Sequence, residues 1–160
     1  STTYSGSLTG FNGTLTKIGY GTLTLAGNNG NYGTTKLNFG TLSLGSSGAL
    51  GSSGTIVFNG GTLQFSANNT NDYSERFSTA AGQAYSLDTN GQNVTLNYPL
   101  NSSGGSLTKL GDGTLTLQNN NSYTGATTIT GGTLAIGIYG QLPDSTAVTV
   151  GSKGTLDVSS

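Results

Sequence analysis

Residues 13–25 read GTLTKIGYGTLTL, and residues 105–117 repeat this pattern as GSLTKLGDGTLTL. In both stretches, Thr or Ser alternates with Leu on either side of a turn that contains two glycines. Alternation of polar and apolar residues predicts a half-buried β-strand, and glycine predicts a turn between strands. Each stretch therefore predicts two short strands joined by a tight turn.

Related segments recur along the whole chain in two interleaved sets. The first set is TLTK, TTKL, TIVF, YSLD, SLTK, TTIT and AVTV, starting at residues 14, 34, 55, 85, 106, 127 and 147. The second set is TLTL, TLSL, TLQF, NVTL, TLTL, TLAI and TLDV, starting at residues 22, 41, 62, 93, 114, 133 and 155. Both sets advance by about 20 residues per step, apart from one step of about 30 residues in the middle.

This spacing predicts an all-β fold, a parallel β-helix (solenoid) of about seven coils of about 20 residues. Each coil must return a strand to a position one strand spacing above its predecessor, which requires a constant step. The long step predicts a short insertion near residues 68–82. The chain 1–160 is then a single β-helix segment, in which the long repeats 13–66 and 105–159 are joined by an inter-repeat region, 67–104.

The alternation also predicts which side chains form the core. In a strand such as TLTL, the leucines point into the coil and the threonines point to water. Burial stabilises each Leu or Val by roughly 1.5 to 3 kcal/mol, so stacked ladders of them would hold the coils together. The predicted interior residues are Leu15, Leu23, Leu25, Leu42, Leu44, Ile56, Phe58, Leu63, Phe65, Leu107, Leu115, Leu117, Leu134, Ile136, Val148, Val150, Leu156 and Val158.

The amino-acid composition excludes most kinds of catalytic and metal-binding site. The chain has no His, Cys, Met or Trp, which excludes an imidazole base, a thiolate nucleophile, a disulfide and the usual zinc, iron or copper sites. Five basic and six acidic side chains are scattered along it, so no basic surface exists to neutralise nucleic acid. No apolar run is long enough to span a bilayer. We therefore expect no catalytic residues, no cofactor, no metal, no nucleic-acid partner and no transmembrane segment.

The residues LTKIGYGTLTLAG at 15–27, LTKLGDGTLTL at 107–117 and NSYTGATTITGGTLAIG at 121–137 resemble the autotransporter-associated β-strand repeat, also called the passenger-associated transport repeat. The resemblance covers essentially the whole chain, although the first copy has NNGNYGTTKLNFG where the second has the more typical sequence. It implies a right-handed β-helix, a handedness that parallel connections also favour. It further implies a secreted or outer-membrane-attached protein of a Gram-negative-type bacterium, serving as a stalk or extracellular fibre and assisting export.

Six residues define the motif shared by the two repeats: Lys17, Gly19, Gly21, Lys109, Gly111 and Gly113. We expect each lysine to lay its stem over the coil edge and to satisfy turn carbonyls, with a ligand contact as the alternative. The glycines lack the helix and the GKS or GKT sequence of a phosphate loop, so positive φ angles in turns explain them better. Asparagines cluster after strands, which predicts turn and ladder roles for Asn28, Asn29, Asn68, Asn69, Asn119, Asn120 and Asn121.

Three further hypotheses depend on polar or aromatic side chains. Asp72, Glu75 and Arg76 form the densest group of charges, which would suit a polysaccharide-active enzyme but fits an exposed loop with an ordinary ion pair better. Outward T-x-T pairs are typical of ice-binding β-helices, but this array is interrupted by Lys36, Ser43, Gln64, Ala135 and Asp157. An adhesin would contact glycans or other cells through exposed Thr, Asn and Tyr side chains, and the contacts to test are Tyr20, Tyr32, Tyr73, Tyr123 and Tyr139.

The function expected from these observations is that of a noncatalytic structural repeat module. The end coils of a β-helix expose unpaired backbone groups and a cross-section of the core. Neither STTYSGSLTG at the start nor SKGTLDVSS at the end resembles a cap. Neighbouring repeats, or copies of the same chain stacked end to end, are therefore the expected partners.

Overall fold

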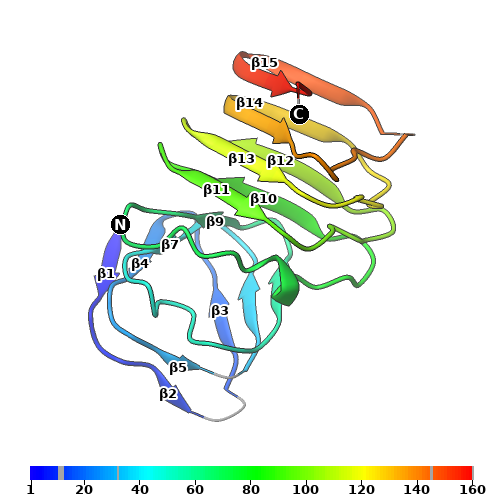
Figure 1. Cartoon of the computed structure of the whole chain (residues 1–160). Helices are drawn as coiled ribbons and strands as arrows, with labels where there is room; N and C mark the ends of the chain where they lie inside the picture. Colours follow the sequence, from blue (N-terminus) through cyan, green and yellow to red (C-terminus); the bar gives the residue numbers. More distant parts are fainter. Residues whose placement is uncertain (11–12, 32, 145, 160) are drawn as a thin grey trace.

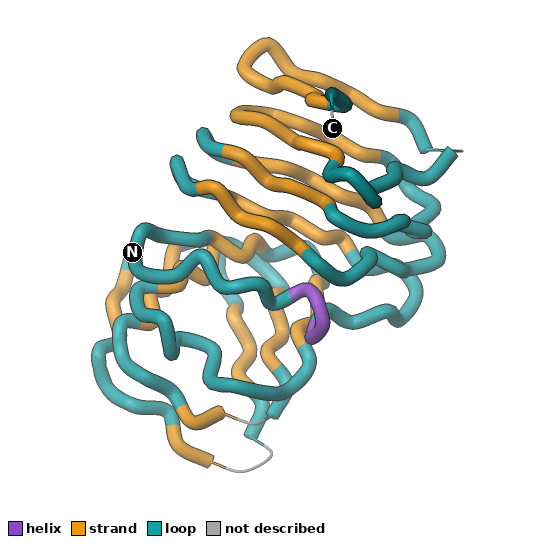
Figure 2. The backbone as a smooth tube through the Cα atoms, viewed as in Figure 1, coloured by secondary structure: helices purple, strands orange, loops and turns teal. Residues whose placement is uncertain are grey.

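The structure is a computed structural model that describes residues 1–10, 13–31, 33–144 and 146–159. It is a parallel β-solenoid of about 7 turns with about 21 residues per turn (Figure 1). Figure 2 shows that the helical turn η1 (Ser74–Arg76) lies on the outside of the middle coils. The elements are β1 (Thr2–Tyr4), β2 (Thr9–Gly10), β3 (Leu15–Lys17), β4 (Thr22–Leu25), β5 (Gly30–Asn31), β6 (Thr35–Leu37), β7 (Thr41–Leu44), β8 (Ile56–Phe58), β9 (Thr62–Gln64), η1 (Ser74–Arg76), β10 (Ala84–Asp88), β11 (Asn93–Leu96), β12 (Ser106–Leu110), β13 (Thr114–Leu117), β14 (Thr127–Ile136) and β15 (Val148–Asp157).

One parallel sheet runs the length of the molecule and forms its spine. Its strands pair in the order β1, β4, β7, β9, β10, β12, β14 and β15. The register steps between facing residues are 19 to 24 residues, with the largest step at Leu63↔Leu87. Every named strand pair in the structure is parallel, as the repeated period predicts.

The sequence-based pairing is wrong in the middle of the chain. The repeat pattern predicts that similar segments stack on one another. It would place TLQF (62–65) under NVTL (93–96) and TIVF (55–58) under YSLD (85–88). Instead β9 pairs with β10, at Leu63↔Leu87, and the ladder of β8 continues only through a bridge between Ile56 and Phe77. The spine therefore absorbs only a few additional residues between β9 and β10, and the expected ten-residue insertion near residues 68–82 is part of a normal coil.

This pairing rotates the second long repeat by one face relative to the first. In the first repeat, LTK forms β3 in a separate sheet with β6 and β8, and TLTL forms β4 in the spine. In the second repeat, LTK lies in spine strand β12, and TLTL forms β13 on the next face, beside β11. Hydrogen bonding between strands depends on backbone, so the spine can continue through segments of different sequence.

The core is one continuous column of stacked apolar side chains. Eleven of the predicted interior residues are buried: Leu25, Leu42, Leu44, Ile56, Phe58, Leu63, Phe65, Leu107, Leu115, Leu117 and Leu134. Leu15, Leu23, Ile136 and Leu156 are partly buried and pack against this column. Leu15 and Leu156 lie in strands that have a paired strand on one side only.

Three predicted core residues are exposed, and those expectations are wrong. Val148 and Val150 have 40% and 46% of their surface exposed, and Val158 has 69%. Val148 and Val150 belong to β15, which pairs with β14 on one side, so no later coil of this chain covers them. Val158 lies just beyond the end of β15.

Aromatic side chains pack together in the middle of the column. The ring of Phe58 packs edge-on against Phe77 and Tyr85, with centroid distances of 4.9 and 5.5 Å. Tyr85 donates a hydrogen bond from its hydroxyl to Ser78 O, and burial raises its pKa to about 12. Such rings bury a large area. They do so where the ladder of β8 ends and the spine continues from β9 to β10.

Candidate functional site

The two motif lysines form identical clamps at the corners of the coils. Lys17 Nζ donates hydrogen bonds to the carbonyl oxygens of Ile18, Gly19 and Phe39, at 3.0, 2.7 and 3.1 Å. Both lysine side chains are buried, and both donate to turn carbonyls as expected. The clamp joins the turn that follows the lysine to the coil above it.

Lys109 repeats this clamp one long repeat later. Its Nζ donates to the carbonyl oxygens of Leu110, Gly111 and Gly131, at 2.9, 2.7 and 3.1 Å. Burial lowers the pKa of Lys109 to about 8, although the charges of Asp88 and Asp112 act in the opposite direction. All three ammonium protons are therefore directed to carbonyl groups, which favours a structural role over ligand binding.

Glycines make room for each clamp. Gly40 and Gly132, which lie in the coil above, have φ angles of 63° and 64°. A Cβ atom at either position would lie 2.8 Å from the lysine Nζ below it. Of the four motif glycines, Gly19, Gly111 and Gly113 have positive φ, whereas Gly21 does not, contrary to expectation. Gly40 and Gly132 occupy the same position in the two repeats, which could have marked them as part of the motif. Sequence reasoning missed this correspondence.

Two buried asparagines form a second pair of clamps. Asn29 Oδ1 accepts a hydrogen bond from Leu8 N at 2.7 Å, and its Nδ2 donates to Ala49 O at 2.7 Å. Each bonded residue belongs to a neighbouring coil, one below and one above. The amide thus connects three successive coils, which satisfies backbone groups that the loop side of the solenoid leaves unpaired.

Asn121 occupies the corresponding place in the second repeat. Its Oδ1 accepts from Leu100 N at 2.9 Å, and its Nδ2 donates to Gln141 O at 2.8 Å. Three other predicted asparagines bond to backbone carbonyls of another coil: Asn68 to Gly45 O, Asn69 to Ser46 O and Asn119 to Asn97 O. Asn28 and Asn120 are exposed. Ladder roles therefore belong to particular members of each asparagine cluster.

The charged group near η1 is a structural staple. Arg76 donates four hydrogen bonds from its three guanidinium nitrogens to the carbonyl oxygens of Leu50, Gly51, Ser53 and Gly54. Its guanidinium lies 5.4 Å from the centre of the Tyr73 ring. The expected ion pair is therefore wrong, because carbonyl groups of one loop occupy the guanidinium. Sequence reasoning could not find this contact, since the loop has no charge to mark it.

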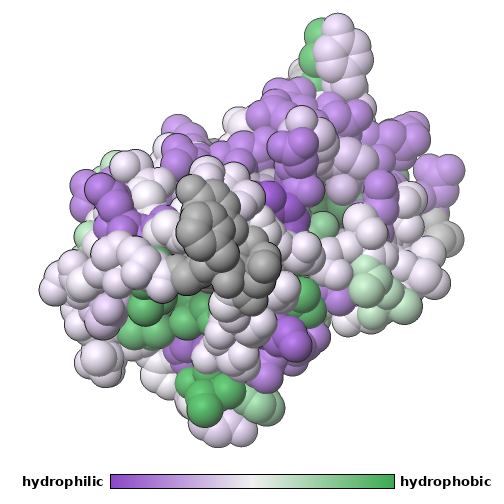
Figure 3. Space-filling model, turned by 90° about the horizontal axis from the view of Figure 1, so that it is seen from below, coloured by the Kyte–Doolittle hydropathy of each residue, from purple (hydrophilic) through white to green (hydrophobic). Residues whose placement is uncertain are grey.

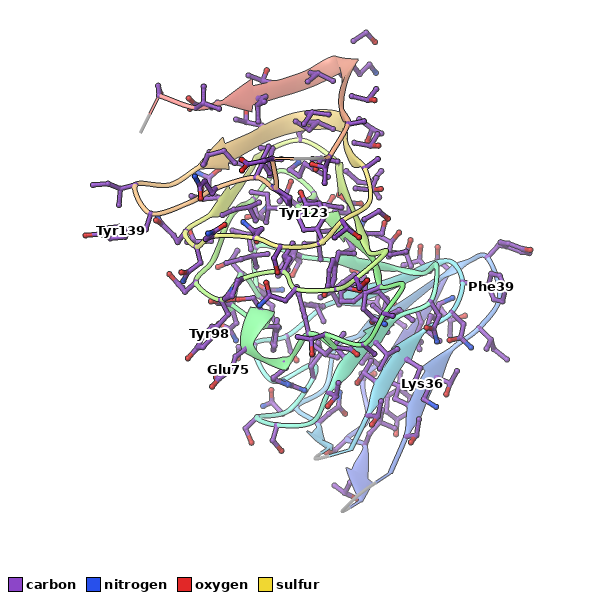
Figure 4. The ribbon with its side chains drawn as sticks, turned by 90° about the vertical axis from the view of Figure 1, so that its right-hand side faces the viewer. Lys36, Phe39, Glu75, Tyr98, Tyr123 and Tyr139 are labelled. Atoms are coloured by element: carbon purple, nitrogen blue, oxygen red, sulfur yellow. The ribbon has the colours of Figure 1, made fainter. Side chains whose placement is uncertain are left out.

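The two carboxylates beside Arg76 do not form a catalytic pair. Asp72 Oδ1 accepts from Ser74 N and Oγ at 2.8 and 2.6 Å, and its Oδ2 accepts from Asn97 N and Nδ2 at 2.8 and 3.0 Å. Glu75 is exposed and points away from the molecule (Figure 4). Among the residues with described positions, no group of three His, Cys, Asp or Glu side chains could hold a metal ion. Asp72 thus ties η1 to the next coil.

The threonine columns on the outside are interrupted as the sequence indicates. In register, Thr24 faces Ser43, which faces Gln64. On the other face, Thr116 pairs with Ala135, which pairs with Asp157. A flat, uninterrupted T-x-T array is therefore absent from these two columns, and the ice-binding alternative loses its surface.

The five tyrosines proposed as adhesin contacts fall in different environments. Tyr73 and Tyr123 are buried, so they cannot contact a partner; Tyr123 bonds through its hydroxyl to Thr127 Oγ1 at 2.5 Å. Tyr20 and Tyr139 are 88% and 77% exposed, and Tyr32 lies outside the described residues. Tyr123 precedes a strand on the loop side, where alternation gives no guide to burial.

One exposed apolar feature is a corner formed by Ile18, Tyr20 and Phe39, which we call the aromatic corner. The rings of Tyr20 and Phe39 have centroids 5.5 Å apart and are tilted by 57°. Figure 4 shows Phe39 projecting from one side of the solenoid, while Tyr98 and Tyr139 project from the opposite side. The corner has no counterpart in the second repeat, where Leu110, Asp112 and Gly131 stand in the equivalent places.

Hollows on the surface include one of about 270 Å³ that is lined by Asn121, Gln141 and Asp144 among others. A hollow of about 390 Å³ beside the first coil is lined by Thr16, Lys17, Ile18 and Leu23 among others, and it contains no carboxylate. The face seen in Figure 3 is mostly neutral or hydrophilic, with separate apolar patches. In the part of the chain that the structure describes, no helix is long and apolar enough to cross a membrane.

Comparison with known proteins identifies the repeats. The passenger-associated-transport-repeat model matches residues 15–44 and 107–136, which contain both lysine clamps and both glycines above them. The chain is similar to the Adhesin BmaC autotransporter of Brucella suis biovar 1 (strain 1330), with 38% identity over 147 residues, covering 79% of this chain and 4% of the adhesin. No solved structure matches. The chain therefore carries two passenger-associated-transport-repeats, at residues 15–44 and 107–136.

Proposed function

We propose that this chain is a noncatalytic structural module of a large secreted or cell-surface protein, in which it serves as a stiff stalk segment. The observation that carries this proposal is the uninterrupted parallel spine from β1 to β15, clamped at its corners by Lys17 and Lys109. Asp72 and Arg76 are committed to internal hydrogen bonds, which supports the absence of catalysis. Shape and stiffness are then what the module contributes.

The family and the relative support the location and context. Passenger-associated-transport-repeats and similarity to an autotransporter adhesin favour a chain that is exported to the outer surface of a Gram-negative-type bacterium and assists that export. This chain spans only 4% of the adhesin's length, so other parts of such a protein would supply most of its contacts. The long repeats 13–66 and 105–159, joined by residues 67–104, are the units that such a stalk would multiply.

The stalk proposal has a length that can be measured. Eight spine strands separated by about 4.8 Å give a rod of roughly 34 Å. Duplicating residues 1–160 within the parent protein should lengthen its surface projection by about one such rod, as seen by electron microscopy of cells. An unchanged projection length, with the longer protein still exported, would show that the module is not part of a stalk.

End-to-end contact is the partner mode that we propose for the module. The strand β1 is exposed along its whole length, and Val148 and Val150 of β15 are exposed at the other end. A neighbouring repeat, or a second copy of the chain, would add a strand at either end and cover these valines. Electron microscopy at several concentrations, with sedimentation as a check, should show rods that lengthen with concentration; strictly monomeric particles at high concentration would exclude self-stacking.

A second candidate function, adhesion, is favoured by the aromatic corner. Exposed aromatic rings stack on the apolar faces of sugars. The half-buried Asn38, which precedes Phe39, and the exposed Asn59 on the next coil are bonded to each other through their amides at 3.0 Å. The second repeat supplies the test variant, Tyr20→Asp combined with Phe39→Gly, since its own equivalents are Asp112 and Gly131. Loss of glycan or cell binding in this variant, with Tyr139→Ser as control, supports adhesion; unchanged binding removes this surface from consideration.

A further inference from the structure

Three Asn-Gly pairs with described positions offer a chemical reaction that needs only water. The backbone nitrogen of the glycine attacks Cγ of the asparagine, a new N–C bond forms, and the side-chain amide nitrogen leaves as ammonia. Water then opens the cyclic imide to aspartate or isoaspartate. Glycine promotes this reaction because it has no side chain to hinder the approach. The pairs are Asn29-Gly30, Asn59-Gly60 and Asn90-Gly91.

The structure protects two of the three attacking nitrogens. Gly30 N donates to Leu8 O at 3.0 Å, and Asn29 is buried. Gly91 N donates to Asp112 O at 2.8 Å, although Asn90 itself is exposed. A nitrogen held in such a hydrogen bond must first be released before it can reach Cγ, so both pairs react only after local opening.

The third pair has a free nucleophile. Gly60 N donates no hydrogen bond to any residue in the described part of the chain, and both Asn59 and Gly60 are exposed. Asn59 N and Gly61 N both donate to Leu37 O, at 2.8 and 3.0 Å, so the turn is fixed on either side of the free amide. The Asn59 side chain is held only by Asn38 Oδ1, at 3.0 Å on the surface.

We propose that Asn59 is a site of spontaneous deamidation in the folded protein. Its product places a carboxylate, or an isoaspartate with one extra main-chain carbon, on the corner beside Asn38. The Asn38 amide then has to turn, because its Oδ1 would face a negatively charged oxygen in place of an N–H donor. A long-lived exterior protein would in this way acquire a negative charge on that corner with age.

Peptide mapping by mass spectrometry tests this proposal on the intact, folded chain after incubation at mildly alkaline pH. Conversion of Asn59 should be about fivefold or more faster than conversion of Asn90 or Asn29, since each protected nitrogen must break a hydrogen bond first. The same chain in denaturant is the control, in which all three pairs should react at similar rates. The variant Asn59→Ser should abolish the main product without altering conversion at Asn90.

Two results would overturn the proposal. Equal conversion of Asn59 and Asn90 in the folded chain would show that the free Gly60 nitrogen gives no advantage. Conversion of Asn59 in denaturant but not in the folded chain would show that the corner holds the pair out of reach. In either case the deamidation of Asn59 would reflect its sequence alone.

Discussion

Lys17 and Lys109 make the same three contacts from different faces of the solenoid. Each ammonium binds the carbonyls of the next two residues and of the residue 22 positions later, yet Lys17 lies in β3 and Lys109 lies in the spine. The clamp thus depends on the local turn and on the coil above, not on which face carries it. The same repeat is therefore compatible with both of these faces of the solenoid.

Replacing Lys109 by Met should reduce the free energy of unfolding by about 2 kcal/mol, because one buried and two partly buried carbonyl oxygens lose their donor. Denaturant unfolding measures this loss. Lys36 is exposed in β6 (Figure 4), so Lys36→Met is the matched control and should change stability by less than about 0.5 kcal/mol. Equal effects of the two substitutions would contradict the clamp.

Stability should rise with pH between about 8 and about 10. The pKa of Lys109 is lowered to about 8 from an ordinary value of 10.5, so in this range the unfolded chain binds more protons than the folded chain. Above pH 10 the buried Tyr85, with a pKa raised to about 12, reverses the trend, because the folded chain then retains the extra proton. Urea unfolding at a series of pH values should show the rise in the wild type and not in Lys109→Met.

The period of the coils and the alternation of the strands could be predicted from sequence, but the pairing in the middle could not. Similarity groups segments with the same pattern of polar and apolar residues, such as TLQF and NVTL, whereas pairing depends on which strand lies one coil away. The backbone hydrogen bonds that pair Leu63 with Leu87 do not depend on that similarity.

Burial on the loop side was also beyond prediction. Tyr123 and Tyr73 lie in segments without alternation, so nothing in the sequence separates them from the exposed Tyr139. The Arg76 staple and the Asn29 clamp bind main-chain carbonyls. Every residue has such a carbonyl, so the sequence cannot identify which ones are bound. Hydrogen bonds from Lys17 and Lys109 to turn carbonyls could be predicted, because the glycines that follow each lysine indicate a turn.

Replacing Arg76 by Ala should cost about 3 kcal/mol of stability and loosen the loop at residues 46–54. Four carbonyl acceptors and the contact with the Tyr73 ring are lost together. Hydrogen exchange should increase in that loop before the rest of the molecule. Arg76→Lys should restore only part of the stability, because an ammonium lacks the planar fork. The exposed Glu75→Gln is the control, and a loop unaffected by Arg76→Ala would refute the staple.

Changing Asn121 to Asp should destabilise the chain at neutral pH and much less at acidic pH. The substitution keeps the acceptor for Leu100 N, but a carboxylate cannot donate to Gln141 O, and burial of its charge raises its pKa above the unfolded value. Stability is then present at low pH, where the protonated carboxyl donates, and is lost as pH rises through the raised pKa. Denaturant unfolding of this variant from acidic to neutral pH should show that decline, whereas Asn120→Asp, at an exposed neighbour, should not. A flat profile for Asn121→Asp would mean that the side chain turns to water and that the three coils do not depend on its amide.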